Sequence, residues 1–191
     1  MDTRKLKDEI FKLYDEYLES YLIASDIAYD IKLRSLNAGE AAPKKGGLYY
    51  EDNRERFNDK AVDLRNKALN IINKALDEIV KVKTAAPSTD AVNYLTLLKS
   101  KTQITEEEIN NALTTYGENY AVCKALMDLA SERKIYGVMY NLDVDKIEAG
   151  LKNIIPSVER WSSIDAESGL SQGSVSFAKM MIEQDIPDAK F

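Results

Sequence analysis

The only cysteine of the chain, Cys123, is the first side chain that could carry chemistry. A cysteine acts as a nucleophile where a neighbouring group lowers the pKa of its thiol, and histidine is the usual neighbour. The sequence contains no histidine, and a single cysteine forms no disulfide within its own chain. Because Tyr120, Met127 and Ala130 share its helical face, we predict that Cys123 is a small, buried and inert core residue.

Acidic residues are abundant, but their spacing does not favour catalysis or metal binding. Glu106, Glu107 and Glu108 are consecutive, and a helix separates consecutive side chains by about 100° instead of converging them. The segment that begins at Asp143 starts like a calcium-binding loop, but Glu148 stands where that loop requires glycine. A hydrolase with paired carboxylates stays an alternative that no spacing supports. We predict no catalytic residue, no cofactor and no metal ligand.

The formal net charge argues against a nucleic-acid backbone as the partner. Lysine and arginine number 26, aspartate and glutamate number 32, and the net charge at pH 7 is -6, whereas neutralising phosphates requires clustered cations. The segment 43–47, PKKGG, lacks the Gly-Lys-Ser/Thr ending of a phosphate-binding loop. The first residues alternate charged and apolar types, and no apolar run approaches the roughly 18 residues of a membrane span. We therefore predict a protein that is neither secreted nor membrane-embedded.

The elements that position these residues are predicted to be helices. Between about Thr3 and Leu36, and again between about Arg54 and Lys83, apolar residues recur every three or four positions, which is the spacing of a helical face. The segment Asn37–Asn53 contains one proline and three glycines and is predicted to be a loop. Two long helices joined in this way favour an antiparallel hairpin.

We predict an all-α chain with three parts. Residues 1–86 form the long antiparallel helical hairpin, residues 87–140 form a small three-helix unit, and residues 141–191 form a C-terminal helix with an extended tail. The tail is rich in serine and glycine with isolated apolar clusters, so we expect the body of the protein or another chain to hold it.

Capping residues set the predicted helix boundaries. Asp90 is the expected cap of the first helix of the three-helix unit. Thr105 and Glu108 have the spacing of a capping box for the second helix, and Asp145 and Glu148 have the same spacing at the start of the C-terminal helix. Pro156 is predicted to end or kink that last helix.

The end of the second helix at Gly117 allows a DNA-reading helix-turn-helix as an alternative interpretation. The fourth position before the turn glycine should be small, but it is Leu113, and the position after it is usually apolar, but it is Glu118. The following helix carries Lys124 and Lys134, yet its acidic and basic residues balance, so it lacks a phosphate-attracting face. Simple helix packing is the favoured interpretation.

Aromatic residues are the candidate interface, because tyrosine combines a large apolar ring with a polar tip that suits an intermittently covered surface. Half-buried core positions are the alternative. The candidate interface residues are Tyr14, Tyr17, Tyr21, Tyr49, Tyr50, Trp161 and Phe177.

Residues 97–135, LLKSKTQITEEEINNALTTYGENYAVCKALMDLASERKI, resemble small, uncharacterised helical proteins encoded in phages and prophages of Gram-positive bacteria. The shared features are the LK before a short turn, the capped ITEEEI helix and the YGENYAVCKAL segment. The resemblance implies a component of a virion or of its assembly rather than an enzyme, located in the host-cell cytoplasm or the virion. It transfers no functional residues.

The predicted function is a non-enzymatic structural or interaction protein, part of a phage virion or of head assembly. It would bind other structural proteins or copies of itself through the hairpin and the tail, as part of an oligomer or larger assembly. The alternative is a regulatory module that binds protein or DNA through residues 87–136.

Overall fold

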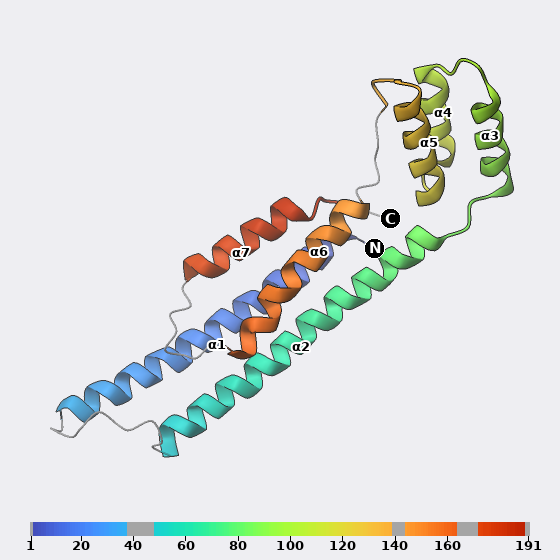
Figure 1. Cartoon of the computed structure of the whole chain (residues 1–191). Helices are drawn as coiled ribbons and strands as arrows, with labels where there is room; N and C mark the ends of the chain where they lie inside the picture. Colours follow the sequence, from blue (N-terminus) through green and yellow to red (C-terminus); the bar gives the residue numbers. More distant parts are fainter. Residues whose placement is uncertain (1, 38–47, 139–143, 164–171, 190–191) are drawn as a thin grey trace.

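The computed structural model describes residues 2–37, 48–138, 144–163 and 172–189, and every regular element within these ranges is helical (Figure 1). The prediction of an all-α fold is confirmed. The elements in chain order are α1 (Thr3–Asn37), α2 (Leu48–Thr84), α3 (Thr89–Ser100), α4 (Glu106–Tyr116), α5 (Tyr120–Glu132), α6 (Val144–Glu159), the 3-10 helix η1 (Arg160–Ser163) and α7 (Gln172–Asp185).

The two longest helices, α1 and α2, lie side by side and run in opposite directions (Figure 1). Helix α2 begins at Leu48, six residues earlier than expected, so the predicted loop is wrong over residues 48–53. No glycine or proline follows Gly47 in that stretch, and the helix can therefore extend back to it. The remainder of the predicted loop, residues 38–47, lies outside the described residues.

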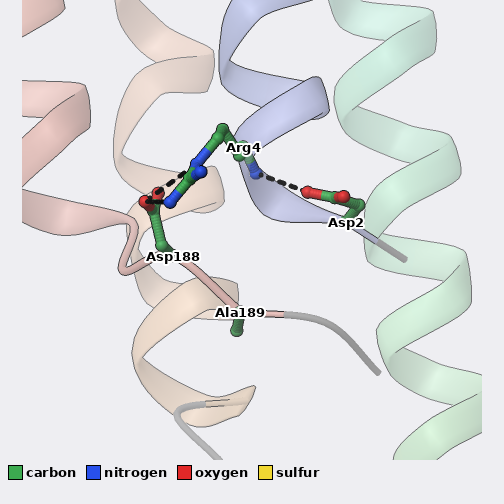
Figure 2. A pocket seen from close by; sticks show the side chains of 4 residues that line it. All are labelled: Asp2, Arg4, Asp188 and Ala189. Atoms are coloured by element: carbon green, nitrogen blue, oxygen red, sulfur yellow. Dashed lines mark hydrogen bonds and ion pairs between the residues drawn. The ribbon is translucent and has the colours of Figure 1, made fainter.

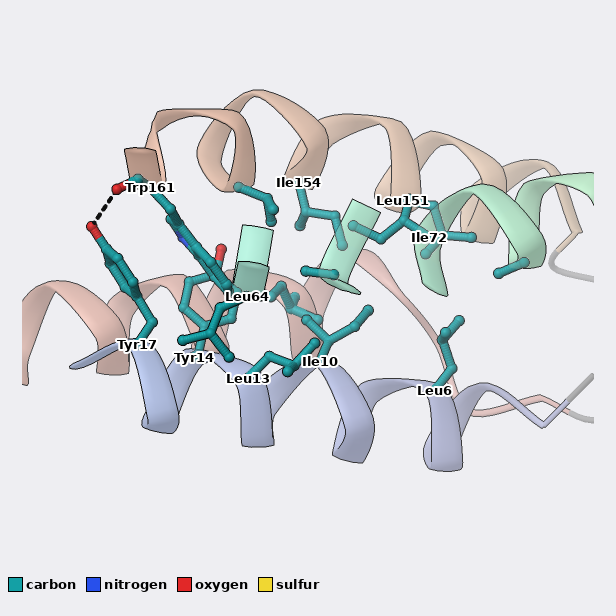
Figure 3. Packing of buried hydrophobic residues seen from close by; sticks show 14 of the residues in the cluster. Leu6, Ile10, Leu13, Tyr14, Tyr17, Leu64, Ile72, Leu151, Ile154 and Trp161 are labelled. Carbon is teal, nitrogen blue, oxygen red and sulfur yellow. Dashed lines mark hydrogen bonds between the residues drawn. The ribbon is translucent and has the colours of Figure 1, made fainter. Parts of the chain in front are cut away.

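The C-terminal helices cover part of this hairpin and share its hydrophobic core (Figure 3). Helix α6 packs on α2, and α7 packs on α1 and α6. The predicted extended tail is wrong over residues 172–185, which form α7 and bury Val175 and Ile182. Pro156 does not end α6, which continues to Glu159 and then tightens into η1. The composition of residues 172–185 favours a flexible chain. The burial of these apolar side chains offsets the conformational entropy that the segment loses when it forms a helix.

Helices α3, α4 and α5 enclose a second, smaller core. The predicted capping box at Thr105 and Glu108 is confirmed: each side chain accepts a hydrogen bond from the other residue's backbone N–H, at 3.2 and 3.0 Å. Gly117 is the C-terminal cap of α4, as predicted. Ser88 rather than Asp90 caps α3, so that expectation is wrong by two residues. The core residues are Ala91, Leu98, Ile109, Ala112, Val122, Leu126, Leu129 and Ala130.

Candidate functional site

Four of the predicted interface aromatics belong to the interior of the long bundle. Each is at most 3 % exposed, so the assignment of Tyr14, Tyr17, Tyr21 and Trp161 to an interface surface is wrong. Figure 3 shows three of them, Tyr14, Tyr17 and Trp161, inside the bundle. The tyrosines recur at three and four residues and therefore occupy one face of α1. That face is covered by η1 and by Phe57 of α2.

Trp161 is the centre of this aromatic cluster. Its ring stacks on Tyr17 and meets the edge of Tyr14, with ring centroids 4.7 Å apart in both pairs. The Tyr17 hydroxyl donates a 3.0 Å hydrogen bond to the backbone oxygen of Trp161, and the Tyr14 hydroxyl lies 3.1 Å from the Ser157 hydroxyl. Burial raises the pKa of both tyrosines. The hydroxyl groups of Tyr14 and Tyr17, which suggested an intermittently exposed surface, therefore have hydrogen-bond partners inside the protein.

The remaining three candidates are placed differently. Tyr49 and Tyr50 belong to α2, but their side chains lie outside the described part of the chain. Phe177 of α7 is 61 % exposed. Two neighbours on the same helix, Met180 and Met181, are 47 % and 38 % exposed. Because these residues are three and four positions apart, they form one apolar surface, which we call the α7 outer face.

The opposite face of α7 is firmly attached. Ile182 and Ile186 are buried against the bundle. Lys179 forms an ion pair with Asp15 of α1, and its Nζ lies 5.6 Å from the ring centroid of Phe11. The outer face is therefore presented on a helix that its own chain holds in place.

The two ends of the described chain meet beside α7 and form a clasp (Figure 2). The Thr3 hydroxyl donates to the Pro187 oxygen at 2.8 Å and accepts from the Ala189 backbone N–H at 2.7 Å. The Nζ atom of Lys7, a residue only 4 % exposed, lies 2.6 Å from Glu183 and 2.7 Å from Asp188. These contacts connect α1 directly to the chain that follows α7.

A pocket beside the clasp is lined by Asp2, Arg4, Asp188 and Ala189 (Figure 2). The Arg4 guanidinium bonds Asp188 at 2.8 Å. Hydrogen bonds from Lys7 and Arg4 hold the pKa of Asp188 below its ordinary value. The charged groups here are thus engaged with one another, and we assign the pocket a structural role.

A denser polar cluster joins α2, α5 and α6. The Tyr120 hydroxyl donates to both carboxylate oxygens of Asp145, at 2.7 and 2.8 Å. Lys83 forms ion pairs with Asp145 and with Glu148, and Lys152 pairs with Glu148 from the next turn of α6. Asp145 was expected to cap α6, but it lies in the first turn of that helix.

The pKa values of this cluster follow its ion pairs. Burial lowers the pKa of Lys83, but the hydrogen bonds to Asp145 and Glu148 outweigh it and raise that pKa above its ordinary value. The hydrogen bond from Lys83 lowers the pKa of Asp145, and those from Lys152 and Lys83 lower the pKa of Glu148. All three groups are therefore charged near neutral pH. Over the described residues, no group of three or more histidine, cysteine or acidic side chains has an arrangement that could hold a metal ion.

Cys123 is 2 % exposed, which confirms its predicted burial. Burial raises the pKa of its thiol to about 11 from an ordinary value of 9.0. We expect a thiol reagent at pH 8 to modify the folded protein at least about ten times more slowly than the protein unfolded in urea, because thiolate is the reactive form. A spectrophotometric thiol assay measures both rates, and equal rates would contradict the inert assignment.

The protein is therefore an all-α protein that has a long helical bundle and a separate three-helix core. No protein-family model, curated protein or solved structure matches the chain. Within the described ranges, none of the helices has the length and apolar character needed to cross a membrane.

Proposed function

We propose that this protein is a non-enzymatic assembly protein that binds a protein partner through the α7 outer face. The observation that carries the proposal is the exposure of Phe177, Met180 and Met181 together on one face of a firmly attached helix. Contiguous exposed apolar side chains are characteristic of binding surfaces, and methionine adapts its shape to a partner. The raised pKa of the Cys123 thiol agrees with a role other than nucleophilic catalysis.

Among the residues that the structure describes, the other exposed large apolar side chains do not form a comparable surface on one short helix. Val92 and Leu97 of α3 are 44 % and 54 % exposed, but their spacing of five residues places them on different sides of the helix. Val92 and Leu97 therefore serve as a matched control, because they are similarly exposed but do not form a continuous apolar surface.

The partner that we propose first is a second copy of this chain. We expect light scattering at micromolar concentration to show a species larger than one chain. The combined variant F177S/M180S/M181S should raise the dissociation constant for self-association at least about tenfold, which corresponds to about 1.4 kcal/mol. The burial of Ile182 and Val175 is untouched by these changes, so the fold should persist.

The control variant V92S/L97S should retain the self-association of the wild type. If both triple and control variants weaken association equally, general surface hydrophobicity is responsible and the α7 outer face is not the binding site. A wild type that is monomeric throughout the micromolar range would contradict self-association.

The setting that we propose is a phage virion or its head-assembly complex. Its support is the resemblance of residues 97–135, which concerns the three-helix unit and not the α7 outer face. Mass spectrometry of purified particles and assembly intermediates from a phage that encodes the protein is the test. If the protein is absent from both the particles and the intermediates, this setting is contradicted. The binding role of the α7 outer face would still be decided by the light-scattering test above.

A further inference from the structure

The three-helix unit has a hydrophobic core of its own. The residues of the smaller core all lie between Ala91 and Ala130 and come from α3, α4 and α5. The larger core is formed by α1, α2, α6, η1 and α7, with a single contribution from the three-helix unit, Tyr120. Tyr120 lies one helical turn before Cys123 on α5, and it packs in the larger core.

Tyr120 is therefore the side chain that fastens one core to the other. It is 8 % exposed, and its hydroxyl donates to the Asp145 carboxylate at the start of α6. The Nζ atoms of Lys83 and Lys124 lie 5.2 and 5.9 Å from the centroid of its ring. Because Lys83 also pairs with Asp145, helices α2, α5 and α6 meet at this one tyrosine.

A second polar contact lies close to the same point. Asn119, which caps α5 through a hydrogen bond to the Val122 N–H, also donates from its side chain to the Ala85 oxygen at 3.0 Å. Residues 85–88 are non-helical and exposed, and they form the connection from α2 to α3. Polar contacts between units that have separate cores are the kind that permit relative motion.

The buried residues of the smaller core come from α3, α4 and α5 alone, so that core does not depend on Tyr120. A bundle without Tyr120 still has the contacts among α1, α2, α6 and α7. Both units can thus stay folded while the joint between them opens.

We propose that the three-helix unit is a movable head, that Tyr120 is the latch that holds it against the bundle, and that residues 85–88 are its hinge. The latch is closed when the Tyr120 hydroxyl bonds Asp145 and the ring lies near the Nζ atoms of Lys83 and Lys124. It opens when the tyrosine is withdrawn, and the head then rotates away from the ends of α2 and α6. The device gives the protein two arrangements of the same folded parts.

The test measures the distance between the two units in the full chain. Spin labels at T96C on α3 and K74C on α2, both exposed positions, leave the buried Cys123 unlabelled in the folded protein. Pulsed electron resonance should give a narrow distance distribution for the otherwise wild-type protein. The variant Y120A should shift the distribution to longer distances and broaden it.

Two further variants separate the parts of the latch. Y120F retains the ring and removes only the hydroxyl, so its distribution should lie between those of the wild type and Y120A. K101Q is the control, because Lys101 forms an ion pair with Glu108 inside the three-helix unit and not across the joint. Its distribution should match that of the wild type.

Two results would overturn the proposal. One is a Y120A distribution as narrow as that of the wild type, since the joint would then be held without the tyrosine. The other is a loss of helical circular dichroism or of cooperative unfolding in Y120A and Y120F, since the two units would then not fold independently. Neither result bears on the α7 outer face, so failure here is distinguishable from failure of the proposed function.

Discussion

Replacing Trp161 with alanine is expected to destabilise the protein by about 3–5 kcal/mol. The side chain is 2 % exposed and contacts both Tyr14 and Tyr17, so its removal leaves a large cavity where η1 covers the hairpin. Within that total, each of the two lost aromatic pairs contributes about 0.5–1.5 kcal/mol beyond the burial of apolar surface. Urea denaturation followed by circular dichroism measures the change without depending on the fluorescence of the only tryptophan.

The matched control for this change is W161F, which retains an aromatic ring and fills part of the same volume. We expect it to lose clearly less stability than W161A, because the remaining cavity is smaller. A loss below about 1 kcal/mol for W161A would mean that the aromatic cluster does not hold η1 on the hairpin. In that case the assignment of Tyr14 and Tyr17 to the interior would also be wrong.

Replacing Gly150 with alanine should destabilise the protein, whereas the same substitution at an ordinary helical glycine is stabilising. In an isolated helix this substitution stabilises by about 1 kcal/mol. Here the new Cβ would lie 2.5 Å from the backbone oxygen of Asp185 and 2.9 Å from Cγ1 of Ile186. The end of α7 must move away, and overpacking of this kind costs about 1–3 kcal/mol. After the gain in helix propensity is subtracted, we expect a net destabilisation of up to about 2 kcal/mol.

Hydrogen exchange locates the effect of G150A as well as its size. The backbone after Asp185 leads directly to the clasp with Thr3, so the amide protons of α7 should exchange faster in the variant. The control is A149G on the exposed side of α6, which should destabilise by about 1 kcal/mol through helix propensity alone and leave α7 exchange unchanged. A stabilised G150A would show that α6 and α7 do not approach this closely.

The helices and several of their ends could be predicted from local patterns. The three- and four-residue spacing of apolar side chains identifies α1 and α2, and the spacing of Thr105 and Glu108 marks the start of α4. These features depend on residues within a few positions of one another. A single sequence contains that information directly.

The partners of each helical face could not be predicted in the same way. The spacing of Tyr14, Tyr17 and Tyr21 shows that one face of α1 is aromatic. The residue that covers this face is Trp161, whose backbone oxygen accepts a hydrogen bond from Tyr17, 144 positions earlier in the chain. Helix α7 was missed because its serines and glycine have low helix propensity, and burial of Ile182 overrides that preference. The packing of Tyr120 in the larger core could not be predicted either, because periodicity identifies a helical face and not the element that covers it.

The insertion of the three-helix unit between α2 and α6 affects the order in which the protein assembles. The smaller core needs only residues close together in the chain, and such local contacts form fast. The bundle must instead wait for residues far along the chain, and the Thr3–Ala189 pair closes a separation of 186 positions. We therefore expect the three-helix unit to fold before the bundle, which would shorten the effective loop between α2 and α6.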